Sequence, residues 1–410
     1  MENPKIRFKG FTKDWEQRKV TDLGEIYIGL VTTMTEHYTD KGHLLIRNSD
    51  IKDGYFEFGE NPIYLDEEFS EQNKSRMHRL GDVITVHTGD IGTSAVIGEN
   101  EVNSIGFATI VTRPNQEILD SNYFATYLNT DTNKQWAVSM ATGDGRSNYN
   151  LKDYTKLIVP IPEIEEQKKI AASIVNLNTL ITLHQRKCEQ TKNLKKYMLQ
   201  KMFPQNGAKV PEIRFDGFTY DWEQRKVLDL LELLTDYDAN GSFADMAKNV
   251  NTTDGDGYAW YVRITDLENP KPLSELKYVD ESSYKFLKNT ELHGGELLMA
   301  KRGEIGKVYI FEPRTRYATV APNMYLLKLN DKVIPHFLYD YFVSEEGNKK
   351  LTRLNASSTM GALYKDDVKN IDVIIPSIEE QDMIGNFFQS IDHLITLHQR
   401  QHKLHLNMLL

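Results

Sequence analysis

The sequence contains very little cysteine, and it lacks long hydrophobic runs. Cys188 is the only cysteine among 410 residues, which excludes a disulfide within the chain and a zinc site built from several cysteines. No apolar stretch approaches the ~18 residues that a membrane span needs. The first residues, Met1–Lys5, lack the apolar core of a signal peptide. We therefore expect a cytoplasmic protein that makes no membrane contact.

Positively charged residues are outnumbered by negatively charged ones. Lys and Arg number 49 against 59 Asp and Glu, so the formal net charge is −10. Binding to phosphates along a nucleic acid depends on Lys and Arg, so this balance argues against a non-specific nucleic-acid coat. A DNA reader remains possible if its basic groups cluster on one face or a partner supplies positive charge. The proportions of hydrophobic (40%) and charged (26%) residues are those of a folded protein, and the length suits two or three domains.

Motifs for catalysis are weak or missing. The chain has no Gly-x-x-x-x-Gly-Lys-Ser/Thr loop for ATP. Asn61–Tyr64 resembles the Asn-Pro-Pro-Tyr motif of amino-group DNA methyltransferases, but no Gly-rich cofactor loop accompanies it, and a turn is the better interpretation. Asp266, Glu275 and Lys277 have the outline of a nuclease metal site, with loose spacing. We expect no catalytic residue, metal or cofactor on this chain; a self-contained methyltransferase or nuclease is the alternative.

The dominant feature of the sequence is an internal duplication. Ile181–Arg186 reads Ile-Thr-Leu-His-Gln-Arg, and the same six residues return at Ile395–Arg400, 214 residues later. Pro4–Val20 returns in similar form as Pro211–Val227, at an offset of 207, and each copy contains Asp-Trp-Glu. Repetition over so long a period indicates a duplicated module. We expect the tryptophan of each copy to pack in a core.

Each hexapeptide lies in a long stretch with helical periodicity, from Ile164 to about Phe203 and from Ile378 to Leu410. Apolar residues recur there at alternating spacings of three and four, which is typical of paired helices. The predicted seam comprises Ile170, Ile174, Leu177 and Ile181 in the first helix and Ile384, Phe388, Ile391 and Ile395 in the second. The connectivity predicts an antiparallel coiled coil with pseudo-two-fold symmetry. We interpret His184 and His398 as polar residues on this seam, not as metal ligands.

Between the repeated segments the pattern changes to short β-rich runs, such as those at 46–51, 82–87 and 106–112, followed by helical sequence from Asn122 to about Ala141. This mixture predicts α+β domains. The predicted organisation is a first domain at 1–160, which begins with the repeated segment 4–25, a spacer helix at 161–210, a second domain at 211–374 and a second spacer helix at 375–410.

The two domains share their framework but not their loops. Gly81-Asp82 and Gly89-Asp-Ile-Gly92 correspond to Gly295-Glu296 and Gly303-Glu-Ile-Gly306, whereas the residues between them diverge. A common scaffold with different loops indicates two readers of two different ligands.

These residues resemble a known family. Paired variable domains, each preceded by the tryptophan segment and followed by the proline-rich exits Val159–Gln167 and Ile375–Gln381 and a long helix, are similar to the DNA-specificity subunit of type I restriction–modification systems. The resemblance implies two target recognition domains that each read one half of a split site in double-stranded DNA. It also implies a non-catalytic subunit that directs adenine-N6 methylation and cleavage by two methyltransferase subunits and two motor-nuclease subunits. S-adenosylmethionine, ATP and Mg would then belong to those partners.

The geometry predicted from the sequence suits that role. Two readers related by a pseudo-two-fold axis are expected to meet DNA about one helical turn apart, roughly 34–36 Å. Because their loops differ, the two half-sites are expected to differ, so the site is asymmetric. A protein-assembly scaffold without a role on DNA is a further alternative.

The candidate DNA contacts lie in loops, where Arg, Asn, Ser and Thr side chains can reach base edges or phosphates. In the first domain they are Arg47, Asn48, Ser49, His87, Thr88, Arg146, Ser147, Asn148, Tyr149 and Asn150. In the second they are Arg263, Thr265, Lys301, Arg302, Ser357, Ser358, Thr359, Tyr364 and Lys365. For Arg47 and Arg263, a role as structural anchors competes with DNA contact.

Overall fold

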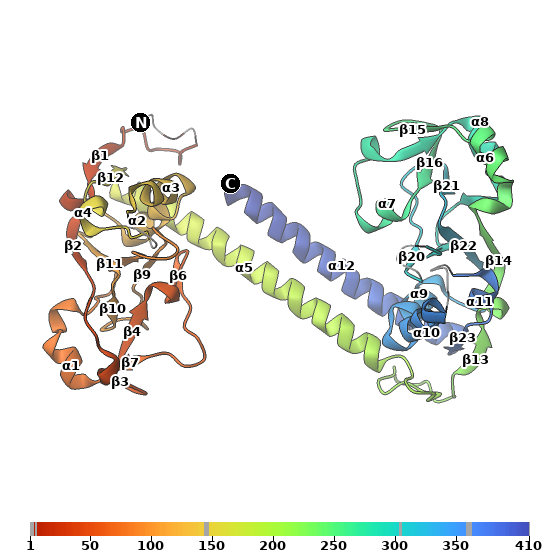
Figure 1. Ribbon diagram of the computed structural model, residues 1–410, viewed down its shortest axis with the longest axis horizontal. Coiled ribbons are helices and arrows are strands. Elements are labelled where there is room, and N and C mark those ends of the chain that lie inside the picture. Colours follow the sequence, from red (N-terminus) through yellow and green to blue (C-terminus); the bar gives the residue numbers. More distant parts are fainter. Residues whose placement is uncertain (1–3, 5, 143–146, 303–305, 358–362, 410) are drawn as a thin grey trace. The chain divides into compact units, whose positions relative to one another are not determined.

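A computed structural model of the chain describes residues 4, 6–142, 147–302, 306–357 and 363–409 (Figure 1). The chain divides into two compact units. Unit 1 comprises Met1–Thr182 with Lys403–Leu410, and unit 2 comprises Leu183–His402. The boundary crosses both long helices, so each unit contains a globular domain and part of each helix.

In unit 1, one sheet has the strand order β2 (Gly24–Ile28), β11 (Ile110–Pro114), β8 (Val83–Thr85), β9 (Ser94–Val96), and another has the order β10 (Ile105–Phe107), β4 (His43–Arg47), β7 (Tyr64–Leu65), β3 (Tyr38–Thr39). β1 (Glu16–Lys19) pairs with β12 (Ile158–Ile161), and β5 (Ile51–Lys52) with β6 (Tyr55–Phe56). The helices are α1 (Glu67–Gln72), α2 (Ser121–Leu128), α3 (Asp131–Met140), α4 (Leu151–Tyr154) and the start of α5 (Ile164–Lys201).

In unit 2, one sheet has the order β14 (Leu231–Asp236), β22 (Met324–Leu329), β19 (Leu297–Ala300), β20 (Val308–Ile310), and another has the order β15 (Thr252–Asp254), β17 (Lys277–Val279), β16 (Ala259–Val262), β21 (Ala318–Val320), β18 (Glu291–Leu292). β13 (Glu223–Lys226) pairs with β23 (Asp372–Ile375). The helices are α6 (Phe243–Asn249), α7 (Ile264–Glu268), α8 (Glu281–Phe286), α9 (Pro335–Val343), α10 (Glu345–Ser357), α11 (Lys365–Lys369) and α12 (Ile378–Leu409).

The two domains repeat one topology. The antiparallel sheet β2-β11-β8-β9 corresponds strand for strand to β14-β22-β19-β20. The other sheet of each domain contains a parallel pair, β4 with β10 and β16 with β21. In both domains the strand after the tryptophan segment pairs antiparallel with the strand before the long helix. The predicted α+β class with two repeated domains is therefore confirmed.

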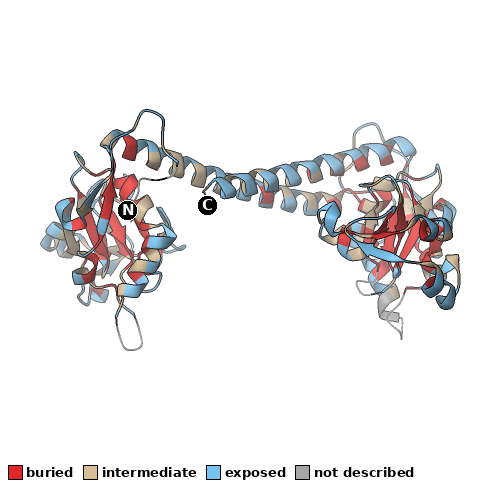
Figure 2. Cartoon of the chain, turned by 90° about the horizontal axis from the view of Figure 1, so that it is seen from above, coloured by how far each residue is buried: buried red, intermediate tan, exposed pale blue. Residues whose placement is uncertain are grey.

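Buried residues concentrate on the sheets, whereas the long helices are exposed over much of their surface (Figure 2). All three residues of β8 are buried, because other elements cover both faces of that sheet. The β-rich run at 46–51 is not one strand, since β4 ends at Arg47 and a turn of 3-10 helix follows at Asn48–Asp50. The Asp50 carboxylate accepts a hydrogen bond from the Arg47 backbone N–H at 2.9 Å and so replaces the next sheet hydrogen bond.

Both long helices are present, with α5 at 38 residues and α12 at 32. A helix of 38 residues extends about 57 Å at ~1.5 Å per residue. Within unit 2 the two helices run antiparallel. Lys195 of α5 donates to Asp392 of α12 at 2.6 and 2.7 Å, and further along His184 Nδ1 lies 3.3 Å from His398 Nδ1. The two histidines are equivalent residues of the repeat, so a local two-fold axis passes between them.

The seam residues differ in how deeply they are buried. In unit 2, Ile384, Phe388 and Ile391 are at most 4% exposed and belong to the domain core, and Ile395 packs against it. In unit 1, Ile170 packs against the domain core, and Ile174, Leu177 and Ile181 are half-buried. The seam residues of unit 2 and Ile170 therefore stabilise the chain's own fold, whereas Ile174, Leu177 and Ile181 remain partly accessible.

The glutamine of each proline-rich exit fastens the long helix to its domain. Gln167 accepts a hydrogen bond from the Asp120 backbone N–H at 2.9 Å and donates to the carbonyls of Ile118 and Pro162, both at 2.9 Å. Gln381 makes the equivalent contacts with Ile334, Lys332 and Pro376. Both glutamines are fully buried, so each needs all of these partners.

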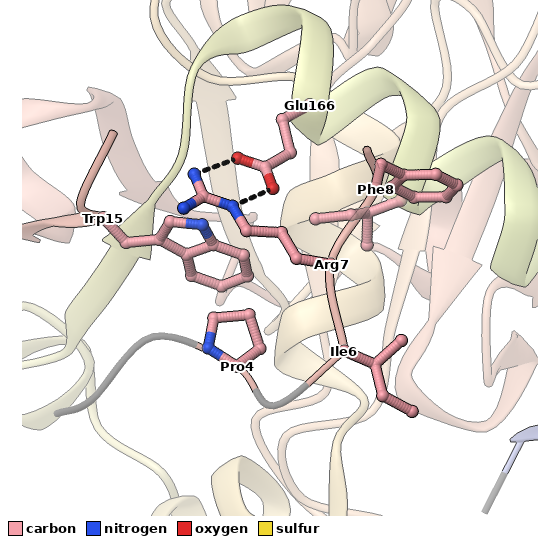
Figure 3. Close-up of a pocket in the computed structure, with 7 residues that line it drawn as sticks. Pro4, Ile6, Arg7, Phe8, Trp15 and Glu166 are labelled. Carbon is pink, nitrogen blue, oxygen red and sulfur yellow. Dashed lines mark hydrogen bonds and ion pairs between the residues drawn. The ribbon is translucent and has the colours of Figure 1, made fainter. Parts of the chain in front are cut away.

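The glutamate before each glutamine binds the N-terminal arm of its repeat, which is the segment from Pro4 to β1 or from Pro211 to β13. Arg7 donates to both carboxylate oxygens of Glu166 at 2.6 and 2.8 Å (Figure 3), and Arg214 to those of Glu380 at 2.7 and 2.8 Å. Hydrogen bonding to the glutamate raises the pKa of each arginine. These paired hydrogen bonds connect residues 159 and 166 positions apart in the sequence. The Arg and Glu of the repeat thus join the two ends of each module.

Asp340 of α9 is a buried carboxyl group that makes the stability of unit 2 depend on pH. Its side chain is buried next to Lys195 and Asp392, and burial raises the pKa of its carboxyl group to about 8. The unfolded chain has the ordinary pKa of ~3.9. The folded state therefore binds the proton more tightly, and stability falls as the pH rises from about 4 to 8.

We expect Asp340→Asn to remove this loss of stability at high pH. At pH 8.5 the free energy of unfolding of the variant should exceed that of the parent by an amount on the order of a few kcal/mol. At pH 4.5 the two free energies should differ little. Urea unfolding followed by circular dichroism at both pH values measures this difference. Asp331→Asn, at an exposed site of the same domain, is the matched control. An equal effect of Asp340→Asn at the two pH values would contradict the assignment.

Candidate nucleic-acid interface

Three segments that are distant in the sequence meet in unit 1. Asn48 accepts a hydrogen bond from the His87 backbone N–H at 2.8 Å, and Thr88 donates to the Asn148 side chain at 2.6 Å. The Asn150 side chain donates to Thr142 at 3.1 Å. The turn after β4, the end of β8 and the loop before α4 therefore form one polar cluster, as expected if they serve one ligand.

Two side chains of this cluster are less available to a ligand than their polarity suggests. Asn48 donates to the carbonyl of Ala108 at 3.2 Å as well as accepting from His87, so it holds the cluster together. Burial lowers the pKa of His87, so its imidazole is neutral at pH 7 and supplies no positive charge.

The two serines predicted to contact DNA in this domain differ in their surroundings. The Ser49 hydroxyl donates to the Asp50 carboxylate at 3.3 Å, so it already has a partner within its own turn. Ser147 is exposed at the start of the described part of its loop. Arg146, the candidate beside it, lies outside the described residues.

Tyr149, which was predicted to contact DNA, is buried in the core of unit 1. Its ring is 2% exposed and packs edge-on against Trp136 and Tyr154, with ring centroids 6.1 and 5.7 Å apart. Burial raises the pKa of its hydroxyl group. The ring cannot reach a base without leaving the core, so the predicted DNA contact by Tyr149 is corrected to a structural role. The alternation of exposed and buried residues along this loop was not evident from its polar composition.

Arg47 and Arg263 occupy equivalent positions and make the same contacts. Arg47 donates to both carboxylate oxygens of Asp50 at 2.9 and 3.0 Å, and Arg263 to those of Asp266 at 2.7 and 3.0 Å. The hydrogen bond to the neighbouring aspartate raises the pKa of each arginine. Both aspartates are buried, so each arginine compensates a buried charge. The geometry favours the anchor interpretation, and contact with DNA by these two residues stays a prediction.

In unit 2, Lys301 at the end of β19 is held by two carboxylates. Its ammonium donates to Asp236 at 2.9 Å and to Asp238 at 2.8 Å, and Lys365 donates to Asp236 at 2.8 Å. Burial alone would raise the pKa of Asp236, but hydrogen bonds from Lys365 and Lys301 outweigh it, and the pKa is lowered. The positive charge of Lys301 is therefore largely compensated within the domain. Sequence reasoning missed Asp236 and Asp238, because nothing local links them to a lysine that is 65 and 63 residues away, respectively.

The remaining candidates of unit 2 differ in exposure. Arg302, Thr265 and Tyr364 are exposed, and the backbone N–H of Leu363 donates to the Lys301 carbonyl at 3.0 Å, which brings the segments of Arg302 and Tyr364 together. Ser357 is the last residue of α10. Ser358 and Thr359 lie outside the described residues.

Arg302 is the candidate whose loss we expect to weaken DNA binding most directly. An exposed arginine that contacts a phosphate releases about one counterion, so Arg302→Ala should lower affinity and reduce the slope of log K against log salt by about 1. Titration of labelled DNA with the assembled complex at several salt concentrations measures both quantities. Lys226→Ala, at an exposed position of β13, is the control. An unchanged slope for Arg302→Ala would show that this residue does not contact a DNA phosphate.

Two of the groups considered for catalysis, Asp266 and Tyr64, make structural contacts. Asp266 accepts both hydrogen bonds of Arg263, and Tyr64 lies in β7, where it pairs with β3 and β4. In the part of the chain that the structure describes, no three His, Cys, Asp or Glu side chains are grouped to hold a metal ion. Over the same residues, no helix is both long enough and apolar enough to cross a bilayer.

Comparison with known proteins connects this architecture to one family. The family model described as the type I restriction modification DNA specificity domain matches residues 12–193 and again residues 220–407. The chain is 22% identical over 409 residues to the putative type I restriction enzyme MjaX specificity subunit of Methanocaldococcus jannaschii, with coverage of 95% of this chain and 89% of the relative. It is 21% identical over 343 residues to the MjaVIII specificity subunit of the same organism, with coverage of 80% and 76%.

Among solved structures, the fold is similar to that of the type I restriction–modification system S subunit from M. genitalium. The TM-score is 0.59 at 13% sequence identity, and the match covers 99% of this chain and 96% of the other. At this identity the likeness concerns the fold alone.

Proposed function

The chain belongs to the type I restriction–modification DNA specificity family, and from that premise we propose that it reads one bipartite, asymmetric DNA site, with each domain reading one half. The observation that carries the proposal is the double match of the specificity domain to a chain whose two domains share one topology. A duplicated scaffold places equivalent loops on both domains, and loops that differ in chemistry read different bases.

The polar groups at equivalent positions differ between the domains. His87-Thr88, in the turn after β8, corresponds to Lys301-Arg302, directly after β19. The first pair is neutral and presents hydrogen-bonding groups, whereas the second presents the exposed Arg302 beside a lysine whose charge Asp236 and Asp238 compensate. Two half-sites of different sequence are the expected consequence.

The long helices are the proposed docking surface for two methyltransferase subunits. Their seam residues are buried or half-buried, but other apolar side chains are exposed in unit 2: Leu183, Leu194, Tyr197, Leu394 and Leu397, at 40–50%. Exposed apolar side chains gathered on a helix pair are typical of protein interfaces. Two motor-nuclease subunits complete the proposed assembly.

We assign the recognition domains to residues 1–160 and 211–374 and the spacer helices to 161–210 and 375–410. In this proposal the chain is non-catalytic and acts in the cytoplasm. S-adenosylmethionine, ATP and Mg bind the partner subunits, which carry out adenine-N6 methylation and cleavage.

A methylation assay tests the proposal. We expect the purified chain alone to transfer no methyl group to DNA, and the chain with its methyltransferase to methylate adenines in a bipartite asymmetric sequence. Sequencing of N6-methyladenine in DNA treated with each preparation measures both outcomes. Methyl transfer by the chain alone, or methylation at a continuous palindrome, would contradict the proposal.

A further inference from the structure

Phe107 exposes an aromatic ring at the edge of the polar cluster of unit 1. It is the last residue of β10 and is 39% exposed, and its partner in the neighbouring strand β4 is Arg47. The Asn48 side chain accepts a hydrogen bond from the His87 backbone N–H at 2.8 Å. It also donates to the carbonyls of Phe107 and Ala108 at 3.4 and 3.2 Å. One side chain therefore fastens the backbone of Phe107 to the other segments of the cluster.

The backbone turns sharply after this ring. Ala108 has a φ of +48°, in the left-handed region that a residue with a Cβ rarely adopts. Its N–H donates to the Leu30 carbonyl at 2.9 Å and its carbonyl accepts from Asn48, so surrounding contacts hold the turn. Residues held in such conformations are concentrated at binding sites. The turn ends β10 and leaves Phe107 at the end of the sheet.

The equivalent residue of unit 2 is a buried alanine. Ala321 lies 214 positions after Phe107 and directly follows β21, the strand that corresponds to β10. β21 pairs in parallel with β16 as β10 pairs with β4, so the two residues occupy equivalent places in their sheets. Ala321 is 2% exposed. At this place the first domain exposes a ring and the second buries a methyl group, a difference expected of a group that distinguishes two half-sites.

On the basis of the proposed function, in which unit 1 reads one half-site, we propose that the Phe107 ring packs against the C5-methyl group of a thymine in that half-site. The polar cluster beside the ring is the candidate DNA interface of unit 1, so DNA that contacts the cluster lies next to the ring. The ring has no hydrogen-bonding group, and the thymine methyl is the apolar group that base pairs present in the major groove.

The exposure of Phe107 distinguishes this contact from insertion between base pairs. Aromatic side chains that wedge into a base step must leave the protein surface far enough to unstack it. More than half of the surface of Phe107 is covered by its own domain, so the residue is suited to contact within the groove.

Replacement of thymine by deoxyuridine, which lacks the C5-methyl group, tests this contact. The chain assembled with its methyltransferase is titrated with duplexes in which each thymine of the half-site, on either strand, is replaced in turn. We expect one replacement to weaken binding on the order of fourfold, the value of one buried methyl group. Phe107→Ala should bind the thymine duplex more weakly than the parent and should not distinguish thymine from deoxyuridine at that position.

Leu80→Ala is the matched control. Leu80 is 64% exposed on the same domain but precedes β8, at the other end of that strand from the polar cluster. This variant should respond to deoxyuridine as the parent does, and Phe107→Leu, which keeps an apolar side chain, should retain part of the discrimination. The slope of log K against log salt should be the same for Phe107→Ala and the parent, because the ring releases no counterion. Circular dichroism checks the fold of each variant.

The half-site read by unit 1 is the one that changes when residues 25–157 are exchanged. Sequence-specific binding that is indifferent to deoxyuridine at every thymine of this half-site, or a half-site without thymine, would overturn the contact and leave the proposed function intact. An equal response of the parent and Phe107→Ala to deoxyuridine would also overturn it. If the assembled complex did not distinguish its methylated sequence from random DNA, the proposed function would be wrong, and the contact with it.

Discussion

Exchange of residues 25–157 for the corresponding segment of another family member is expected to change one half of the methylated sequence and leave the other half unaltered. The exchanged segment contains β4, β8 and the loop before α4, which together form the polar cluster of unit 1. It leaves β1, β12 and α5 in place, so the arm, the exit and the spacer helix are retained. The expected effect is a complete change of specificity at one half-site.

Mapping of N6-methyladenine in cells that carry the parent or the exchanged chain measures this result. The reciprocal exchange of residues 233–372 is the matched control and should change only the other half. If either exchange altered both halves, the two domains would not read DNA independently, and the bipartite proposal would be wrong.

Loss of the Arg214–Glu380 pair is expected to cause the largest change in stability. The Glu380 side chain is 1% exposed, so Arg214→Met leaves a buried carboxylate without its charged partner. Breaking a buried pair in this way costs ~3–5 kcal/mol. For a unit of this size we expect a decrease in Tm on the order of 10 °C.

Thermal unfolding followed by circular dichroism measures the decrease. Arg225→Met is the control, because Arg225 pairs with Glu223 on the surface of the same unit and should matter little. The double variant Arg214→Met/Glu380→Met should recover much of the loss, since no buried charge remains. Equal effects of Arg214→Met and Arg225→Met would show that the pair does not fasten the arm.

Much of the fold could be predicted because its signals are local or repeated. The helical periodicity predicted α5 from Ile164 to about Phe203, and the helix runs from Ile164 to Lys201. The repeat predicted two similar domains, and the strand order confirms them. The run at 46–51 was predicted less well, because the Asp50 carboxylate ends the strand through a contact that β-propensity does not report.

The candidate site was harder to predict. Polar composition identified the segments that meet in unit 1, but it did not separate a buried ring such as Tyr149 from an exposed neighbour such as Ser147. Nor did it show that Lys301 is held by Asp236 and Asp238, since these carboxylates are more than 60 residues away. Which polar groups are available to a ligand depends on such distant partners.

The duplication, the two long helices and the family resemblance could be derived from the amino-acid order alone, because they depend on periodicity and on repeated residues. The folded structure was needed to explain why the Glu-Gln pair of each exit is repeated: the glutamate binds the arginine of the arm, and the glutamine binds the loop before α2 or α9. It was also needed to show that Phe203, which follows α5, packs against the rings of Trp222, Phe337 and Phe388 in unit 2. These are contacts between segments far apart in the chain, and packing alone brings them together.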